Sequence, residues 1–370
     1  MQETSKLIIS KCNSYNFNEI YYTLERHIKF FSIEKFYNKK VLLKPNLLSA
    51  QKPEKAVTTH PEFLRAIIRL FKNFNCEILV GDSPSTLNFE EVISETGIKK
   101  VCEEEKVEIL NLTTYPKIEF DFNKFGIKKI VISKIVKEVD FIINLPKLKT
   151  HSLMLFTCGI KNMYGLVPGQ VKSIYHRYAI NPKDFFEILY AVYSYKKPEL
   201  TFVDGILGMD KEGPSGGDVK QFKVIITSDS AESIDLFLSE KVFKNRFYKN
   251  ILSHKPYKIV NLNFPLENFR LRPPKTFWLV FNFPKWILKL SKNVLSFYPK
   301  ILQEKCKKCG KCRQICPKTT IKYLNGFYFI YKKDCVSCFC CAEVCPYNAI
   351  KIKRSFIFDL IMKLKELIFG

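Results

Sequence analysis

Long apolar stretches are missing from this 370-residue chain. No run of about 18 apolar residues occurs, so the sequence predicts no membrane-spanning helix. The first residues, MQETSKLIISKC, lack the basic start and the apolar core of a secretory signal, which favours a cytoplasmic protein. Low-complexity tracts are absent too. A hydrophobic fraction of 46% is ample for a buried core and excludes a largely disordered chain.

Acidic residues are scarce relative to basic ones, 36 against 60, which leaves a formal net charge of +24 at pH 7. General enrichment in lysine explains part of this excess, and the remainder favours anionic partners. No DNA-reading or RNA-reading motif is present, so nucleic acid is not expected as a partner. We expect instead a redox partner protein or a small anionic substrate. The oligomeric state is left open.

Short apolar runs alternate with amphipathic helical patterns from residue 1 to about residue 265. Their length and β-branched content predict strands in seven runs: 6–10, 39–44, 76–81, 107–112, 140–145, 200–205 and 222–227. Helical periodicity predicts helices over 61–74, 88–97, 182–195 and 230–243. Pro61 and Pro182 occupy first helical positions, and Asn181 is a plausible N-cap. This alternation predicts an α/β domain over residues 1–265 with a largely parallel sheet.

Cysteine is abundant and unevenly placed, because nine of the thirteen cysteines lie between Cys306 and Cys345. Such clustering in a large chain indicates metal binding in a reducing compartment rather than disulfide bonds. Two copies of one spacing, C-x2-C-x2-C-x3-C-P, begin at Cys306 and Cys335. This spacing is typical of bacterial ferredoxins, in which the fourth cysteine of each copy binds the other of two iron–sulfur clusters.

The crossover predicts an α+β, ferredoxin-like domain with two [4Fe–4S] clusters over residues 306–353. The two expected ligand sets are Cys306, Cys309, Cys312 and Cys345 for the first cluster, and Cys335, Cys338, Cys341 and Cys316 for the second. Zinc is the alternative, but zinc sites usually use two C-x2-C pairs rather than two complete copies of this longer pattern. Cys340 is left over and is expected to be a small buried thiol. Between the copies, Asn325-Gly326 predicts a hairpin with a type I′ turn.

Two further segments flank the cysteine motifs. Residues 266–305 hold both tryptophans and read as a basic, aromatic linker with a short helix at about 286–297. Residues 354–370 read as an amphipathic C-terminal helix. Both have the composition of interfacial anchors, so peripheral contact with the inner face of the membrane is an alternative. Packing against the chain itself or a dimer partner is the favoured interpretation.

Several polar residues follow predicted strands, at the edge where α/β sheets build their sites. Amide and lysine side chains there would bind carboxylate or phosphate groups, and a histidine could move a proton. The candidate catalytic residues are Lys147, Lys149, His151 and His176, and the candidate substrate-binding residues are Lys44, Asn46, Lys161, Asn162 and Asp204. A loop at Gly81 lacks the Gly-Lys-Ser/Thr ending of a P-loop, so a nucleotide site is not predicted there.

Six blocks of the chain resemble one known family. They are KPN at 44–46, NLPKLKTH at 144–151, GIKNMYG at 159–165, the region of His176, DGILGM at 204–209 and the Gly-Pro loop at 213–214. The chain is similar to the domain of unknown function 362 family over residues 5–350. The resemblance implies an uncharacterised iron–sulfur protein with a C-terminal double-cluster ferredoxin domain. It implies no substrate and no catalytic role for any residue.

The sequence therefore supports three functions. The first is an oxidoreductase that passes electrons through two [4Fe–4S] clusters to an anionic substrate in the α/β domain. The second is an electron carrier or redox subunit whose α/β domain is a docking module. The third is a non-redox enzyme whose clusters are structural. A cluster close to the candidate residues would favour the first function.

Overall fold

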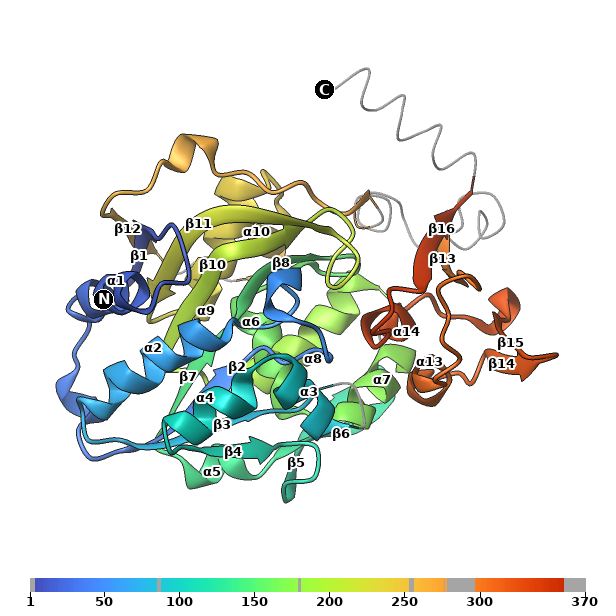
Figure 1. Cartoon of the computed structure of the whole chain (residues 1–370), viewed down its shortest axis with the longest axis horizontal. Helices are drawn as coiled ribbons and strands as arrows, with labels where there is room; N and C mark the ends of the chain where they lie inside the picture. Colours follow the sequence, from blue (N-terminus) through green and yellow to red (C-terminus); the bar gives the residue numbers. More distant parts are fainter. Residues whose placement is uncertain are drawn as a thin grey trace.

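The structure is a computed structural model, and it describes residues 4–84, 88–178, 181–252, 256–275, 277 and 297–355. A ten-stranded sheet runs through the larger of two units (Figure 1). Its main order is β12-β1-β11-β10-β7-β2-β3-β4, and β8 and β9 extend it beside β10. Most strand pairs are parallel, so the prediction of an α/β fold with a largely parallel sheet is confirmed.

The strands of this sheet are β1 Ser5–Lys11, β2 Lys40–Pro45, β3 Glu77–Asp82, β4 Glu108–Asn111, β7 Phe141–Leu145, β8 Lys147–His151, β9 Leu155–Thr157, β10 Leu200–Asp210, β11 Asp218–Ser228 and β12 Tyr257–Asn261. All seven predicted strands are among them. A separate hairpin consists of β5 Lys117–Lys124 and β6 Ile127–Ser133.

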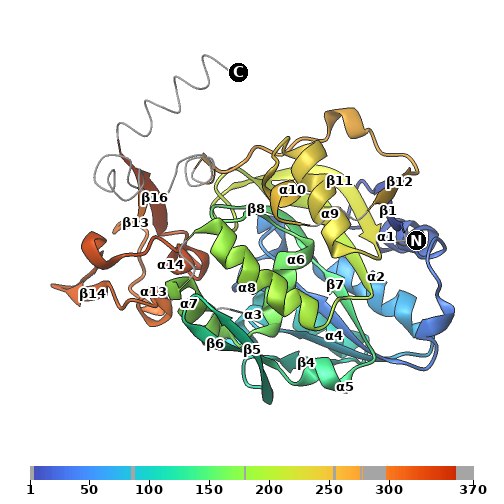
Figure 2. The same ribbon diagram turned by 180° about the vertical axis from the view of Figure 1, so that it is seen from behind.

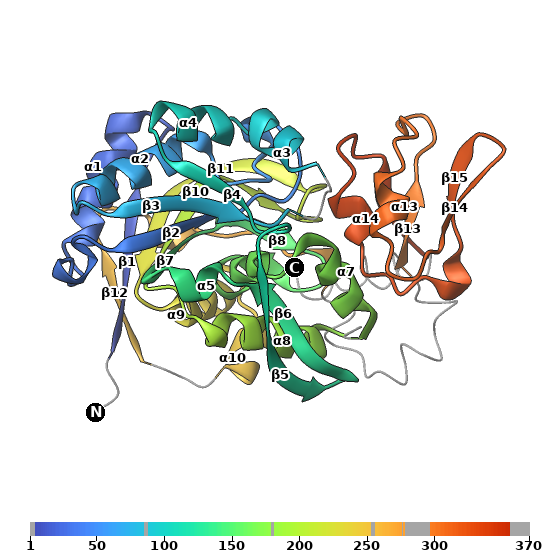
Figure 3. The same cartoon turned by 90° about the horizontal axis from the view of Figure 1, so that it is seen from below.

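Helices cover both faces of the sheet (Figure 3). One face carries α1 Phe17–Ile28, α2 Pro61–Lys72, α3 Phe89–Glu95 and α4 Ile98–Glu104. The other carries α5 Ile135–Glu138, α6 Gly159–Asn162, α8 Pro182–Tyr195, α9 Ala231–Phe237 and α10 Phe247–Ile251, which Figure 2 shows from behind. Helix α7, Gly169–Tyr178, lies beside the cysteine-rich unit. Shorter elements include the 3-10 helix η3, Met163–Leu166, and the π-helix η4, Leu238–Val242.

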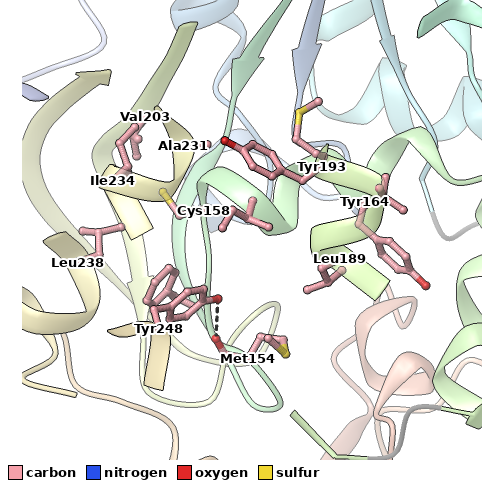
Figure 4. Close-up of a cluster of buried hydrophobic side chains, with 14 of the residues drawn as sticks. Met154, Cys158, Tyr164, Leu189, Tyr193, Val203, Ala231, Ile234, Leu238 and Tyr248 are labelled. Atoms are coloured by element: carbon pink, nitrogen blue, oxygen red, sulfur yellow. Dashed lines mark hydrogen bonds between the residues drawn. The ribbon is translucent and has the colours of Figure 1, made fainter. Parts of the chain in front are cut away.

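Alternating side chains of the strands feed two hydrophobic cores, one on each face. In β2, Val41 and Leu43 join the core under α1 and α2, whereas Leu42 joins the opposite core. That second core is drawn in Figure 4, where the Tyr248 hydroxyl donates to the Met154 carbonyl at 3.2 Å. A strand buried on both faces must be apolar throughout, which is why the strands read as continuous apolar runs.

The predicted helix starts are also confirmed. Pro182 begins α8, and the Asn181 side chain accepts the Asp184 backbone N–H at 3.0 Å. Pro61 begins α2, where the cap is His60, whose Nδ1 accepts the Glu62 N–H at 3.2 Å. Proline suits these positions because a first helical residue has no internal partner for its N–H.

The cysteine-rich unit is small and built around two short strand pairs. Strand β13, Phe297–Ile301, pairs antiparallel with β16, Ile350–Arg354, and the hairpin consists of β14, Ile321–Leu324, and β15, Phe327–Ile330. Helices α13, Lys311–Ile315, and α14, Cys340–Glu343, follow the cysteine loops. Asn325 and Gly326 have φ values of 47° and 80°, as the predicted type I′ turn requires.

The pairing of β13 with β16 includes residues 297–301 in this unit, although the sequence suggested a linker over 266–305. The helix predicted at about 286–297 and the C-terminal helix predicted over 354–370 lie outside the described residues, except at Phe297, Arg354 and Ser355. None of the helices in the described ranges has the length and apolarity needed to cross a membrane.

A buried histidine connects α1 to the sheet. His27 is fully buried, with Nδ1 2.7 Å from Thr227 Oγ1 and Nε2 2.7 Å from Ser10 Oγ. Burial, and secondarily the charge of Arg26, lower the pKa of His27 to about 3. Because the unfolded pKa is about 6.5, neutral His27 contributes its full stability above that pH and loses it as the pH falls toward 3.

Replacing His27 by glutamine should therefore flatten the pH dependence of stability. Between pH 7 and pH 5 we expect His27 to account for about 2 kcal/mol of the fall in unfolding free energy. His27→Gln keeps a donor and an acceptor but cannot titrate. Urea unfolding followed by circular dichroism at both pH values measures the difference, with Tyr22→Ala at an exposed site as the control. A variant that loses as much stability as the wild type would contradict this role.

Candidate functional site

A polar cavity lies between the two units, with about 630 Å³ of space free of atoms, part of it open to solvent. The carboxyl ends of β2 and β3, the end of α6 and one face of α7 form most of its wall. The larger unit supplies Asn46, Leu47, Leu48, Asp82, Ser83, Lys149, Thr157, Lys161, Asn162, Tyr164, Gly165, Lys172, Ser173, His176 and Pro214. The cysteine-rich unit supplies Ile315, Cys340 and Glu343.

Three amides fix α6 against the sheet. Strands β2 and β7 are parallel, with Lys44 opposite Asn144. Asn144 accepts from Asn162 Nδ2 at 2.8 Å, and Asn162 Oδ1 accepts from Asn46 Nδ2 at 2.9 Å. Asn144 and Asn162 each donate and accept, and Asn46 donates, so the chain of bonds fixes the orientation of Asn46 and Asn162 at the cavity wall.

Asp235 holds the start of α6 from the other side. Its two carboxylate oxygens accept the Gly159 and Ile160 N–H groups at 2.8 and 2.9 Å. Burial raises the pKa of Asp235 to about 7, against the opposing effect of these two bonds. Gly159 must be glycine here, because a Cβ would lie 2.7 Å from the Ala231 carbonyl oxygen. These contacts present Lys161 and Asn162, one turn later, to the cavity.

A buried ion pair supports the floor of the cavity. Lys44 Nζ lies 2.9 Å from Asp82 Oδ1, and both side chains are buried. Asp82 Oδ2 also accepts the Leu47 N–H at 2.7 Å. Gly165 packs directly on the pair, and a Cβ at that position would overlap both charged groups. Asp82 reaches the cavity wall, whereas Lys44 lies behind it.

Lys147 and Asp204 form a second buried pair, away from the cavity. Their charged atoms are 2.9 Å apart, and the Tyr15 hydroxyl donates to Asp204 at 2.6 Å. Lys147 and the Leu207 N–H both donate to the same hydroxyl oxygen, at 2.6 and 3.1 Å. The network ties β8 to β10 and holds Lys147 and Asp204 in the interior, away from the lining of the polar cavity.

Three lysines give the cavity a positive wall. Lys149 donates to the Val57 carbonyl and Lys172 to the Ser83 carbonyl. Burial is the main cause that lowers the pKa of both lysines to about 7. The pKa of Lys161 is lowered by burial as well, and its ammonium forms no hydrogen bond or ion pair with any residue that the structure describes. Lys161 is therefore available to an anion.

His151 and Glu343 join the two units beside the cavity. The N–H groups of Leu153 and Met154 donate to His151 Nδ1 at 3.1 and 3.2 Å, so the ring hydrogen is on Nε2. His151 Nε2 donates to Glu343 Oε1 at 3.0 Å. Burial, followed by the charge of Lys161, lowers the pKa of His151 to about 4. Burial would raise the pKa of Glu343, but the His151 hydrogen bond and nearby cations lower it to about 2.

Three buried polar atoms of the cavity wall have no hydrogen-bond partner within the described residues: Asn46 Oδ1, Thr157 Oγ1 and His176 Nδ1. The His176 ring stacks on Phe185 with centroids 4.1 Å apart, and burial lowers its pKa to about 3. Leaving a buried polar atom unpaired costs about 1–3 kcal/mol. The wall is therefore suited to a polar ligand or to water.

Two smaller cavities lie inside the cysteine-rich unit, with about 330 and 320 Å³ of space free of atoms. The first is lined by Cys306, Cys309, Cys312 and Cys345, and the second by Cys316, Cys335, Cys338 and Cys341. These are the two sets expected from the crossover. Across the described ranges, no three His, Cys, Asp or Glu side chains converge closely enough to bind one metal ion. Iron binding stays a prediction.

The backbone around these two cavities repeats, as the doubled motif does. Positive φ recurs two residues after the first cysteine and one residue after the second cysteine of each copy: Lys308 55°, Gly310 76°, Ser337 53° and Phe339 62°. The amide four residues after the last cysteine of each copy donates to that sulfur, at 3.4 Å for Cys316 and 3.3 Å for Cys345. Such N–H bonds favour the thiolate, the form that binds metal.

The polar cavity shares a wall with the second cysteine cavity. Ile315 and Cys340 line the polar cavity, and their neighbours in sequence, Cys316 and Cys341, line the cysteine cavity. At both places consecutive residues of one backbone segment line the two spaces, so the two cavities lie on either side of the same segments. Helix α14 thus presents Cys341 to one cavity and Cys340 with Glu343 to the other.

The structure brings together five of the nine predicted catalytic and substrate-binding residues at the cavity: Asn46, Lys149, Lys161, Asn162 and His176. His151 lies behind Glu343, while Lys44, Lys147 and Asp204 lie in interior ion pairs. Asp82, Tyr164 and Cys340 belonged to segments noted in the sequence without a role. Lys172 and Glu343 were missed. The signal for Glu343 was that it is the only charged residue inside the second cysteine motif, residues 335–346.

Comparisons with known proteins place one known family on the larger unit. The family model described as "Domain of unknown function (DUF362)" matches residues 41–240. A protein named "Thylakoid-associated protein" from Synechocystis sp. is 29% identical over 207 residues, which are 54% of this chain. The match spans 62% of that relative's length. Among solved structures, the lactate racemase apoprotein from Thermoanaerobacterium thermosaccharolyticum is similar with a TM-score of 0.41 and 13% identity, over 64% of this chain and 58% of that one.

Substituting Gly165 by alanine should disrupt the floor of the cavity. The new methyl group would force apart Lys44 and Asp82, and an uncompensated buried charge costs about 3–5 kcal/mol. We expect a lower urea midpoint and a loss of that order in unfolding free energy. Gly216→Ala is the control, because the nearest atom to its Cβ would be 3.4 Å away. Equal stability of the two variants would show that the pair does not depend on this close approach.

Proposed function

The chain belongs to the DUF362 family, which is defined by a domain of unknown function, so its activity has to be inferred from its own residues; we propose that it is an iron–sulfur oxidoreductase that passes electrons to a small anionic substrate. The observation that carries this proposal is the wall shared by the polar cavity and a cysteine cavity. An electron that reaches the second cysteine set is then beside the substrate.

The two cysteine cavities support the identity of the cofactor. Each is lined by four thiols, the number that a [4Fe–4S] cluster requires. Zinc sites more often take their ligands from two C-x2-C pairs than from two complete copies of this longer pattern. The ligand sets would be those of the crossover, in an α+β ferredoxin-like unit with two [4Fe–4S] clusters. Such a cluster, when bound, supplies or accepts one electron at a time.

The charges of the polar cavity support an anionic substrate. Lys161 has no competing partner among the described residues, and the Thr157 hydroxyl can donate to an anion. Asn46 Oδ1 would accept from a hydroxyl or N–H of the same substrate, and the role of His176 Nδ1 depends on its tautomer. A carboxylate or phosphate group would pair with the ammonium in a partly buried place, where the attraction is stronger than in water. Glu343 limits where the negative charge of the substrate can lie, because its carboxylate would repel an anionic group placed next to it.

Protons for the reaction would come from the lysines with lowered pKa. Lys149 and Lys172 titrate at about 7, so each exists in both forms near neutral pH. A group with a pKa near the working pH is an effective acid or base. His151 and His176 stay neutral there, because their pKa values are about 4 and about 3. His151 would position Glu343, and His176 would offer a hydrogen bond to the substrate.

The same proposal implies a cellular compartment for the protein and a role for each of its two units. Eight reduced thiols need a reducing compartment, which favours the cytoplasm. Residues 4–265 would form the substrate unit, and residues 297–355 the electron-transfer unit. A carrier without substrate, the alternative function, has no use for a polar cavity beside its cluster, so the oxidoreductase is favoured.

The crossover makes a specific prediction about Cys345. Cys345→Ala should damage the cluster of the first motif, because Cys345 lines the cavity with Cys306, Cys309 and Cys312. Cys316→Ala should damage the other cluster, because Cys316 lines the cavity with Cys335, Cys338 and Cys341. Anaerobic reconstitution followed by iron and sulfide analysis and by EPR of each variant measures this. Cys340→Ala is the matched control and should keep the full iron content. Wild-type protein that binds zinc but no iron would refute the proposal.

The substrate site is tested at Lys161. Small carboxylates and inorganic phosphate should be screened against the reconstituted protein by isothermal titration calorimetry. Lys161→Met should weaken binding of the best anion by about tenfold or more, because it removes a charge-assisted pair. Lys183→Met, at an exposed position of α8, is the control. Equal affinity of wild type and Lys161→Met for that anion would contradict the assigned role.

A further inference from the structure

One cysteine of the two sets faces solvent. Among the eight, only Cys309 is exposed, while the others are buried or partly buried. It lines the first cysteine cavity, and no lining residue of that cavity is a sequence neighbour of a residue that lines the polar cavity. Cys341 and Cys345 are buried in one packed cluster, and Cys312 and Cys316 pack against it, so thiols of both sets lie together. The two cysteine cavities therefore adjoin. The path from the polar cavity through the second and then the first cysteine cavity ends at Cys309.

The surface beside Cys309 has an apolar centre. In the hairpin β14–β15, Ile321 and Ile330 face the second cysteine cavity and Tyr328 faces the first. The alternation of strands then turns Leu324 and Phe327 outward, where they are 48% and 42% exposed. Tyr347, which lines the cavity of Cys309, is 46% exposed. The hairpin extends away from the larger unit (Figure 1).

Lysines surround this centre. Lys307 and Lys308 are exposed next to Cys309, and neither forms an ion pair with any residue in the described ranges. Lys308 Nζ lies 5.0 Å from the centroid of the Phe327 ring, which connects the lysines to the hairpin. In contrast, Lys311 is held by Glu91 of the larger unit at 2.7 Å. Residues 297–355 contain thirteen Lys and Arg against only three acidic residues, of which Glu343 is buried.

We propose that the surface formed by Lys307, Lys308, Cys309, Leu324, Phe327 and Tyr347 docks an acidic one-electron carrier protein. A small apolar centre with a charged rim is the form of weak, transient redox interfaces. The lysines would steer an acidic carrier and raise its association rate. The inference rests on the proposed function, because it names the electron donor of the same path.

The transfer is a simple exchange. One electron leaves the reduced carrier, which is oxidised, and enters at the Cys309 side, where the iron held by the first cysteine set is reduced. No bond and no proton changes place in this step. Cys309 is suited to the entry point because its exposed sulfur brings the carrier closer than any other thiol of the two sets.

The test uses the full chain with reconstituted iron and a reduced, acidic plant-type [2Fe–2S] ferredoxin as the probe. Stopped-flow absorbance measures the second-order rate of electron transfer at low and high salt. Lys307→Glu/Lys308→Glu should lower the rate at low salt by about tenfold or more, and the difference should shrink as salt rises. Phe327→Ser should lower the rate at both salt concentrations. Lys39→Glu/Lys258→Glu, with the same charge change on exposed residues of the larger unit, should keep the wild-type rate.

The outcomes separate this surface from the proposed function. Dithionite reduction of each variant reports on the iron itself. If dithionite reduces all proteins and the probe reacts with all of them at one rate, the docking surface is refuted and the proposed function stands. If dithionite fails to reduce the wild type, both are refuted. Flotation with anionic vesicles that is lost in Lys307→Glu/Lys308→Glu, together with an unchanged probe rate, would assign the surface to lipid and refute the carrier.

Discussion

The bond between His151 and Glu343 is the buried contact through which the two units shape the polar cavity. Glu343 is a carboxylate buried at a junction, and an unpaired charge in such a place costs several kcal/mol. His151 donates one N–H to Glu343. The ring of His151 is itself held by two backbone amides of the β8–β9 turn. The orientation of a loop in the α/β unit is thereby transmitted to α14, and through α14 to the cysteines on both sides of it.

The polar cavity exists because several charged groups are balanced around this bond. Lys44 and Lys147 are neutralised by Asp82 and Asp204 in the interior. Three other lysines face the cavity, where Glu343 is the carboxylate supplied by the second unit. Burial penalises each of these charges, so the surplus of positive charge is tolerated only in a space that an anion or water can enter. The same cost of burying a charge explains why the lysines around the polar cavity have lowered pKa values.

Much of the fold could be predicted from the sequence, because its signals are local. Strands such as 140–145 are buried on both faces and read as apolar runs, and the start of α8 is marked by Asn181 and Pro182. The grouping of cysteines follows from spacing alone. Partners far apart in the chain carry no such signal. Lys147 and Lys149 are two residues apart and look equivalent, yet Lys147 meets Asp204 and Tyr15 while Lys149 reaches the cavity. Glu343 could not be assigned because its partner lies 192 positions away.

The short helix α14 makes the substrate cavity and the cysteine site depend on the same few residues. A cavity closed by Cys340, Glu343 and Ile315 is complete only when the cysteine-rich unit has its native shape. Units of this size with metal ligands commonly need the metal in order to fold. Under the proposed function, a chain without bound iron would thus lose one wall of its substrate site as well as its source of electrons. Substrate would be retained only by molecules able to reduce it, and a damaged molecule would release it unchanged.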